Sequence, residues 1–488
     1  MTNISEHKGN VTAIMVVIVA VLSGLVCAVT GASPPHQDNP SMKRDRFLLL
    51  DNRIVEQTKN ARLAVGKVQK SRHNPLFSED KAWEVRFDNL YANVIYDRQE
   101  KLYECWYSPF IIDQAGQKPP IEKRSQSPYR PRNREMGICY ATSEDGLRWM
   151  KPKLRLVKFN GSNLNNLVFR GPHGAGIFAD LHDPDPKRRY KMFFKGSKIS
   201  VAFSHDGLNW SKGIECPEIN ARGDTHNNAL WAPTLGEYVG FTRTWAPPRG
   251  RQVARTSSKD FLHWSKAEVV LEGLENHLQT YAMPVFYYAG VYLGLPAIYN
   301  SKIDRTHTEL AWSPDTIIWH RIDPGNPLIA NSPKKGQYDW GCVYAAACPV
   351  FEKDEIRLYY GSSDDKHFGW RNGYFCLATL RPDGFAGYEQ VSKNTSAFVV
   401  TKPLLYTGGT LCLSADIYGQ GFVRTRLLND NDEELAAAKS VRQSVADIKV
   451  EWQNELSIQA LKGKMIRLEF ELRNAKLYSF SFYRNQRR

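Results

Sequence analysis

The sequence predicts an all-β fold, a five-bladed β-propeller followed by a small C-terminal β-sandwich. First, a seven-residue corner of the form Ser-x-Asp-x-x-x-Trp recurs at intervals of about 54–68 residues, the kind of period found in repeat architectures. Second, each corner follows short alternating runs rich in Tyr, Phe and Trp, which are typical of strands. Third, the pattern changes after residue 390, where alternating runs with Gly turns predict a separate β domain.

The corner occurs in four copies, SEDGLRW, SHDGLNW, SKDFLHW and SPDTIIW, which begin at Ser143, Ser204, Ser258 and Ser313. A fifth copy, Arg381-Pro382-Asp383-Gly384-Phe385, is shortened. Ser and Asp side chains commonly hydrogen-bond the backbone of a turn, and Trp offers a large surface for packing. We therefore expect the corner to fasten the outer part of each blade, and to have a structural role.

Five inner runs and five aromatic-rich second runs accompany the corners and define five units. The inner runs are residues 88–97, 175–183, 225–233, 278–288 and 337–351. The second runs are residues 102–110, 189–196, 237–244, 291–300 and 356–364. Units of about four strands each predict a propeller over 46–395 and a sandwich over 396–488. A run at 46–57 is predicted to be a strand packed on the far domain, and 433–444 is the one helix-like stretch.

The N-terminal segment has the pattern of an export signal. An apolar run covers residues 11–30, Lys8 precedes it, and Thr30-Gly31-Ala32 is a small-residue cleavage site. This predicts a signal peptide over 1–32 and a periplasmic or extracellular location. An uncleaved N-terminal anchor is the alternative, because the run is long for a signal peptide.

Charge and cysteine content narrow the class of partner. The formal net charge of the 488-residue chain is +14, which favours acidic partners such as sulfated or uronic-acid glycans. Dispersed charge that only keeps the surface soluble is the alternative. No basic run interleaves with aromatic residues, so nucleic acid is not an expected partner. Without Cys27 the chain has seven cysteines and no CxxC motif, which predicts buried free thiols.

The repeats resemble a known superfamily of carbohydrate-active enzymes. Five units, Ser-x-Asp-Gly-x-x-Trp corners and a C-terminal sandwich are similar to the arabinanase/levansucrase/invertase-like superfamily, which holds glycoside hydrolase families 32 and 43. The likeness to secreted bacterial family 32-like proteins rests on further motifs over 46–488. These are Leu-Leu-Leu-Asp at 48–51, Asp-Pro at 183–184 with Arg-Tyr-Lys at 189–191, Tyr-Val-x-Phe-x-Arg at 238–243, and Arg-x-Asp-Gly-Phe at 381–385.

The resemblance implies three acidic residues, one from each of the first three blades. They would act as base or nucleophile, as stabiliser and as general acid, because glycosidic cleavage needs one protonated and one ionised carboxyl group. The candidates are Asp88, Asp180 and Asp224, with Glu275 as a substitute for the third. A turn-capping or salt-bridged role is the alternative for each Asp.

Other side chains on or near the inner runs are candidates for substrate binding. They are Glu275, His226, Arg243, Tyr281, Tyr338, Asp339 and His367. Arg243 is suited to clamp a carboxylate or sulfate, and the two histidines to bind a metal or transfer protons. Trp83, Trp231, Trp245, Trp340 and Trp370 are candidates to stack on sugar faces. No cofactor is required and no metal-ligand set is predicted. A structural calcium ion in the central funnel, where the inner strands of all blades would converge, stays open.

These observations predict a secreted glycoside hydrolase-like protein that cleaves a polysaccharide or oligosaccharide. The chain lacks the Trp-x-Asn-Asp-Pro-Asn and Arg-Asp-Pro motifs of family 32. A non-catalytic glycan-binding propeller is therefore the first alternative. A sialidase-like enzyme, suggested by the corners, is the second. A sialidase-like enzyme would need a cluster of three arginines, and only Arg243 is well placed in the sequence to belong to one.

Overall fold

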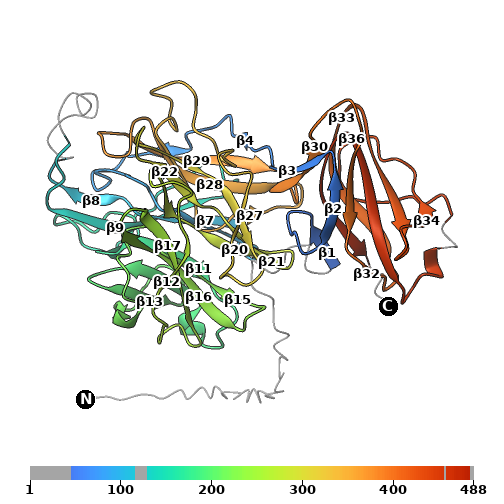
Figure 1. Cartoon of the computed structure of the whole chain (residues 1–488). Helices are drawn as coiled ribbons and strands as arrows, with labels where there is room; N and C mark the ends of the chain where they lie inside the picture. Colours follow the sequence, from blue (N-terminus) through green and yellow to red (C-terminus); the bar gives the residue numbers. More distant parts are fainter. Residues whose placement is uncertain (1–44, 116–128, 455–457, 484–488) are drawn as a thin grey trace, which may run out of the picture. The chain divides into compact units, whose positions relative to one another are not determined.

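The computed structural model describes residues 45–115, 129–454 and 458–483, and the regular structure in these ranges is almost entirely strand (Figure 1). Two short 3-10 turns interrupt it, η3 (Pro186–Arg188) and η4 (Pro217–Ile219). The all-β prediction is confirmed. In these ranges no helix has the length and apolar character needed to cross a membrane. The predicted signal peptide, residues 1–32, lies outside the described residues.

Four antiparallel sheets of four or five strands form most of a propeller-like ring (Figure 1). The first contains β6 (Asn93–Asp97), β7 (Leu102–Tyr107), β8 (Phe110–Asp113), β9 (Arg134–Ser143) and β10 (Leu167–Arg170). The second contains β11 (His173–Ala179), β12 (Tyr190–Lys195), β13 (Ile199–Ser204) and β14 (Ile214–Glu215). The third contains β15 (Asn228–Ala232), β16 (Glu237–Ala246), β17 (Gly250–Ser258) and β18 (Glu268–Leu271). The fourth contains β20 (Val285–Tyr288), β21 (Val291–Gly294), β24 (Leu310–Ser313) and β25 (His320–Ile322).

The strands expected to form a fifth blade belong to a larger, nine-stranded sheet. Its members are β19 (Leu278–Ala282), β22 (Ala297–Asn300), β23 (Arg305–Thr308), β26 (Cys342–Ala345), β27 (Val350–Phe351), β28 (Ile356–Ser363), β29 (Gly373–Leu380), β4 (Gln69–Lys70) and β5 (Phe77–Ser78). A parallel bridge between β23 and β26 joins strands from two successive units. β4 and β5 both pair with β29. Two strands from the start of the ring's sequence therefore belong to its last sheet.

The corners have the structure predicted for them. At the second corner, Asp206 Oδ1 accepts hydrogen bonds from the backbone N–H groups of Leu208 (2.9 Å) and Asn209 (2.7 Å). Ser204 Oγ accepts one from Gly207 N (2.9 Å). The same pattern recurs at the corners that contain Asp145, Asp260 and Asp315. The carboxylate and hydroxyl therefore satisfy backbone donors that a strand ladder would leave free.

The corner tryptophans pack against the preceding unit, as expected. Trp264 lies 5.0 Å from the ring of Phe193, and Trp319 lies 5.8 Å from Phe241. Trp149 of the first corner packs on Phe375 of β29, with 5.4 Å between ring centroids. The same packing therefore joins neighbouring sheets and also joins the first sheet to the last.

A ten-stranded sheet contains the C-terminal part of the chain together with its first described strands (Figure 1). Its members are β1 (Asp45–Leu48), β2 (Val55–Lys59), β3 (Ala61–Val65), β30 (Ala386–Gln390), β31 (Ala397–Thr401), β32 (Leu404–Leu405), β33 (Thr410–Leu428), β34 (Glu434–Ala437), β35 (Val445–Lys449) and β36 (Met465–Tyr483). β1 pairs with β36, which confirms that the run beginning at residue 46 packs on the far part of the chain.

The helix predicted over 433–444 is wrong. Within this stretch β34 pairs with β33, and a further isolated bridge joins Val441 to Val423. Ala and Glu favour helix in isolation, but the 19-residue β33 offers an unpaired edge along this stretch. Pairing satisfies both backbones, and tertiary context overrides the local preference.

The seven cysteines of the described residues form no disulfide with one another, and six of them are buried. Only Cys348 is partly exposed. The prediction that most of these cysteines are buried is confirmed.

Candidate functional site

The innermost strands of the first three sheets run side by side in one direction. An isolated parallel bridge joins Ala175 of β11 to Asn227, just before β15. Asn93 of β6 donates to Ala175 O (2.9 Å) and accepts from Ile177 N (2.9 Å). Residues that precede these strands therefore gather at one end of the ring, and residues that follow them gather at the other. We call the first the entry end.

Gly174 allows the second and third units to meet closely at the entry end. Its φ is +54°, and a Cβ atom there would lie 1.6 Å from the carbonyl oxygen of Thr225. Only glycine fits this approach without displacing backbone. As a result His173 Nε2 lies 2.7 Å from Asp224 Oδ1.

Asp224 is an exposed carboxylate held by two basic side chains. Besides His173, it contacts Arg243 Nη2 at 2.6 Å, and 61% of its side chain is exposed. Partial burial raises the pKa of Asp224, but His173 and Arg243 outweigh burial and hold it well below its usual range. Asp224 is therefore ionised at neutral pH and available to a ligand.

A pocket of about 380 Å³ opens beside Asp224. Its lining residues are Arg222, Asp224, Arg243, Trp245 and Arg251. The hairpin of β16 and β17 supplies three of them, because Trp245 lies opposite Arg251 in the ladder and Arg243 lies two residues before Trp245. The volume lies in the range of about 300–1,000 Å³ that is usual for small-molecule sites.

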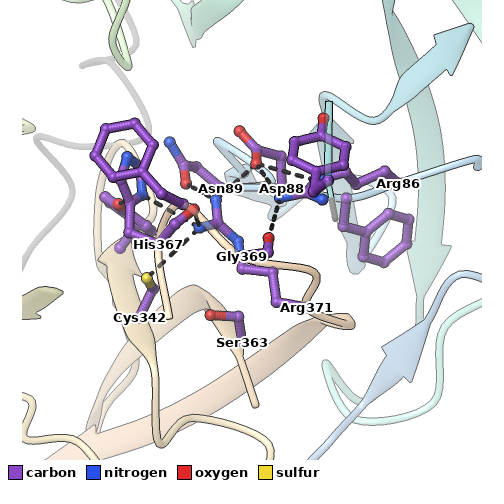
Figure 2. Close-up of polar contacts among 12 residues, drawn as sticks. Arg86, Asp88, Asn89, Cys342, Ser363, His367, Gly369 and Arg371 are labelled. Atoms are coloured by element: carbon purple, nitrogen blue, oxygen red, sulfur yellow. Dashed lines mark hydrogen bonds and ion pairs between the residues drawn. The ribbon is translucent and has the colours of Figure 1, made fainter. Parts of the chain in front are cut away.

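Asp88 forms a second charged cluster at the entry end, shown in Figure 2. Its Oδ1 lies 2.6 Å from Arg371 Nη2 and 3.2 Å from Arg86 Nη2. Arg371 Nη2 also donates to Asn89 Oδ1 (2.8 Å). Burial raises the pKa of Asp88, but the charges of Arg371 and Arg86 outweigh it and hold the pKa far below its usual range.

The loop that carries Asp88 is strained. Asp88, Leu90 and Tyr91 have φ values of +55°, +64° and +44°. L-residues rarely adopt this region, and such conformations cluster at functional sites, where the surrounding structure enforces them. Arg371 hydrogen-bonds two residues of this loop, Asp88 and Asn89.

Tyr281 connects the two charged clusters. The Arg243 guanidinium lies 4.9 Å from its ring, and Asn89 Nδ2 lies 3.4 Å from its hydroxyl. The ring of His367 is 5.0 Å away. Asp88 and Asp224 therefore belong to one continuous polar site at the entry end.

Both predicted histidines are buried there and neutral. Burial lowers the pKa of His226 to about 3. Burial, together with the nearby Arg371 charge, lowers the pKa of His367 well below its usual value. His367 Nδ1 lies 3.1 Å from the Tyr344 hydroxyl. Neither imidazole is charged at neutral pH.

The structure does not bring Asp180 together with Asp88 and Asp224. Asp180 follows the last residue of β11, whereas His173 begins that strand, a separation of roughly 20 Å along an extended chain. Its buried carboxylate contacts Lys191 Nζ (2.7 Å) and the Tyr238 hydroxyl (2.6 Å). It lines a cavity of only about 80 Å³ with mainly apolar walls.

The remaining predicted residues lie in other surroundings. Asp339 is fully buried and pairs with Lys70 (2.5 Å) and the Tyr360 hydroxyl (3.1 Å). The Tyr338 hydroxyl accepts from Asn74 (3.4 Å). Glu275 is exposed and contacts His277 (3.1 Å).

Several residues of the entry end were not among the sequence candidates. They are Arg86, Asn89, His173, Arg222, Arg251 and Arg371. The alternation of the β16–β17 hairpin was a usable signal for Arg251, because it places this residue on the same face as Arg243 and Trp245. The expectation that Arg243 would be the one well-placed arginine was wrong, since Arg222 and Arg251 line the same pocket.

Within the described ranges, no group of three or more His, Cys, Asp or Glu side chains is placed to hold a metal ion.

No protein-family model and no curated protein matches the chain. Solved structures of similar fold include one from the GH130 family of mannoside phosphorylases, which contains glycoside hydrolases that target β-1,2-mannosidic linkages in Candida mannan. Its TM-score is 0.42 at 16% identity, covering 65% of this chain and 95% of that one. An N-acetylgalactosamine deacetylase from F. plautii has a TM-score of 0.43 at 13% identity, covering 66% and 96%. A glycosyl hydrolase from Bacteroides ovatus has a TM-score of 0.42 at 16% identity, covering 65% and 94%. At these scores and identities the similarities assign no activity to this chain.

Proposed function

We propose that this protein is an exported glycoside hydrolase-like enzyme, of the kind found in families 32 and 43, that binds a carbohydrate at the entry end and cleaves a glycosidic bond there. The observation that carries the proposal is Asp224, an exposed and ionised carboxylate on the wall of a pocket of about 380 Å³. Trp245 lines the same pocket and is 45% exposed, which suits stacking on a sugar face. Export rests on the sequence pattern of residues 1–32.

The proposal includes a five-bladed propeller over 46–395 and a sandwich over 396–488, to which β1–β3 add strands. A contact from each unit to the corner of the next supports five units. The contacts are Tyr359 to Gly146 O (2.9 Å), Trp106 to Gly207 O (2.7 Å), Arg188 to Asp260 O (2.5 Å), Arg255 to Thr316 Oγ1 (2.7 Å) and Tyr288 to Asp383 Oδ1 (2.5 Å).

The chemistry assigns different roles to the groups of the entry end. Asp224, with its lowered pKa, suits the base that activates water or the nucleophile that attacks the anomeric carbon. Asp88 stays ionised and would stabilise the positive charge that develops on the sugar ring. His173, whose Nε2 lies 2.7 Å from Asp224 Oδ1, is the proposed proton donor to the leaving oxygen, because a protonated imidazole can act as a general acid. No cofactor takes part in this chemistry, and activity with and without a chelator tests whether calcium has a structural role.

The test is single replacement of the three predicted acids, Asp88→Asn, Asp180→Asn and Asp224→Asn, with Asp430→Asn as an exposed control. Activity is screened on neutral and sulfated glycans, and NMR gives the stereochemistry of the products. We expect Asp224→Asn and Asp88→Asn to remove activity and the control to keep it. Activity that survives all three replacements contradicts the proposal.

The second candidate is a non-catalytic glycan-binding propeller. The specific observation in its favour is that Asp88 and Asp224 both have lowered pKa values, so neither carboxyl suits the role of general acid. Glycan binding with no release of product would favour this candidate. Turnover that depends on His173 would favour the hydrolase.

A further inference from the structure

We propose that the pocket formed by Arg222, Arg243 and Arg251 is a subsite for an acidic sugar, one that carries a carboxylate or a sulfate group. The inference rests on the proposed function, because it takes the same pocket as the carbohydrate site. It names the class of substrate, which the fold and the charged pair Asp224–His173 leave open.

The charges in the pocket do not balance. Three guanidinium groups line it together with a single carboxylate, that of Asp224. This carboxylate is already engaged by Arg243 and His173. Within the described ranges, neither Arg222 nor Arg251 forms an ion pair with an acidic side chain. A bound anion would supply the missing negative charge.

Arg251 shows the imbalance most clearly. It is half-buried, its Nη1 donates to Gln279 Oε1 (2.8 Å), and its Nε has no hydrogen-bond partner among the described residues. Its guanidinium lies 5.0 Å from the ring of Tyr281 and 4.8 Å from the ring of Tyr299. A cation partly removed from water is destabilising unless it is paired. The two rings offset only part of the cost of removing the guanidinium from water, since cation–π contacts contribute modestly.

Arg243 provides a second, deeper donor. It is 5% exposed, and its Nε and Nη1 have no hydrogen-bond partner in the ranges that the structure describes. Its Nη2 contacts Asp224, which fixes the plane of the guanidinium. A fixed guanidinium matches the two oxygens of a carboxylate or sulfate group.

Trp245 makes a sugar, rather than a free anion, the expected ligand. Its indole is 45% exposed, and the Arg222 guanidinium lies 5.6 Å from the ring. An exposed indole next to cationic donors offers an apolar face for the sugar ring and charged donors for its acidic substituent. The net charge of +14 would also attract a polyanionic glycan.

The experiment measures binding of three tetrasaccharides to the full chain by calorimetry. One carries carboxylates (from homogalacturonan), one carries sulfates as well (from chondroitin sulfate), and the third is the carboxyl-reduced, neutral form of the first. We expect at least one acidic probe to bind at least tenfold more tightly than the neutral one. The two acidic probes separate recognition of a carboxylate from recognition of a sulfate. Equal binding of all three, or binding of none, overturns the inference.

Variants assign the binding to the pocket. Arg222→Ala and Arg251→Gln should each weaken binding of the acidic probe tenfold or more, while Arg148→Ala, whose side chain is 92% exposed at the first corner, should not. Arg222 is exposed, so its replacement should leave the fold intact, and the melting temperature of each variant checks this. Acidic binding that survives both replacements overturns the inference. Acidic binding with no cleavage of any glycan contradicts the proposed hydrolase alone, whereas cleavage restricted to neutral glycans contradicts this inference alone.

Discussion

At the scale of single residues, neighbours decide what each aspartate can do. Asp88, Asp180 and Asp224 belong to three successive units of one repeat. Asp224 is open to solvent between His173 and Arg243, and Asp88 is clamped by two arginines. Asp180 is buried against Lys191 and Tyr238. The first two suit a ligand site, and the third suits a structural ion pair.

His173 is the residue on which the proposed chemistry can be tested most directly. Replacing it by Gln keeps a polar side chain beside Asp224 but removes the imidazole ring, and with it the proposed proton donor. We expect turnover to fall about 100-fold or more, the usual contribution of a general acid, while glycan binding changes little. Initial rates and calorimetric binding on the same preparation measure both effects. Unchanged turnover would assign proton transfer to another group.

At the scale of elements, the repeated corner and the hairpin have separate tasks. The corners satisfy turn backbone and connect neighbouring units. The β16–β17 hairpin and the segments that precede β6, β11 and β15 carry the charged groups of the entry end. Stability and ligand recognition can therefore be altered independently.

The corner aspartates should make stability depend on pH. Partial burial raises the pKa of Asp206, but hydrogen bonds from Asn209 and Leu208 outweigh it and lower the pKa to about 2. A carboxyl whose pKa is lower in the folded state stabilises the fold above its unfolded pKa of about 3.9. This contribution is lost as the pH falls from about 4 to about 2.

Asp206→Ala should therefore destabilise the protein by about 1.5–3 kcal/mol at pH 7, the range for hydrogen bonds to a charged group. The difference from wild type should shrink between pH 4 and pH 2. Urea unfolding at several pH values measures it, with Asp430→Ala as the exposed control. A difference that stays constant down to pH 2 would show that the charge of Asp206 has no part in the effect.

Gly174→Ala tests how the second and third units meet. The new Cβ would lie 1.6 Å from Thr225 O, so the backbone of one unit has to move. We expect a loss of more than about 1 kcal/mol in stability and a loss of activity, because the contact between His173 and Asp224 depends on this approach. Gly236→Ala, where φ is also positive but no atom lies within 4 Å of the new Cβ, separates the close approach from the conformational effect. Equal effects of the two changes would contradict this explanation.

At the scale of the whole molecule, Asp383 of the shortened fifth corner joins distant parts of the chain. Its buried carboxylate accepts hydrogen bonds from Arg46 and Tyr288, and from Ser414 (3.2 Å) and Ser479 (2.6 Å). These residues lie on β1, β20, β33 and β36. The fifth corner therefore connects the ring to the ten-stranded sheet.

Asp383→Asn should lower the free energy of unfolding by about 3–5 kcal/mol, because it leaves the Arg46 guanidinium without its closest carboxylate. We also expect the ring and the ten-stranded sheet to unfold in separate transitions. Denaturant unfolding followed by Trp fluorescence, together with limited proteolysis, measures both. A single transition at the wild-type midpoint would contradict a joining role.

The sequence was most informative where the same local chemistry repeats. The four corners keep the Ser and Asp that bond their own turn, so their structure follows from a few adjacent residues. The sequence was least informative where a residue distant in the chain determines the secondary structure or the role of a side chain. Residues 434–437 become a strand because β33 lies beside them, and Arg371 becomes a site residue because its loop reaches Asp88.

The amino-acid sequence by itself therefore determined the all-β class, the repeat, the role of its corners and the burial of most cysteines, because each depends on local hydrogen bonding or on residue type. Only the tertiary structure decided which polar residues share a site. The inner strands run parallel, so side chains before β6, β11 and β15 converge, while Asp180, one strand length away, does not. The three arginines of the pocket come together because the loop before β15 meets the paired strands β16 and β17 there, where Gly223 N donates to Arg243 O (3.1 Å).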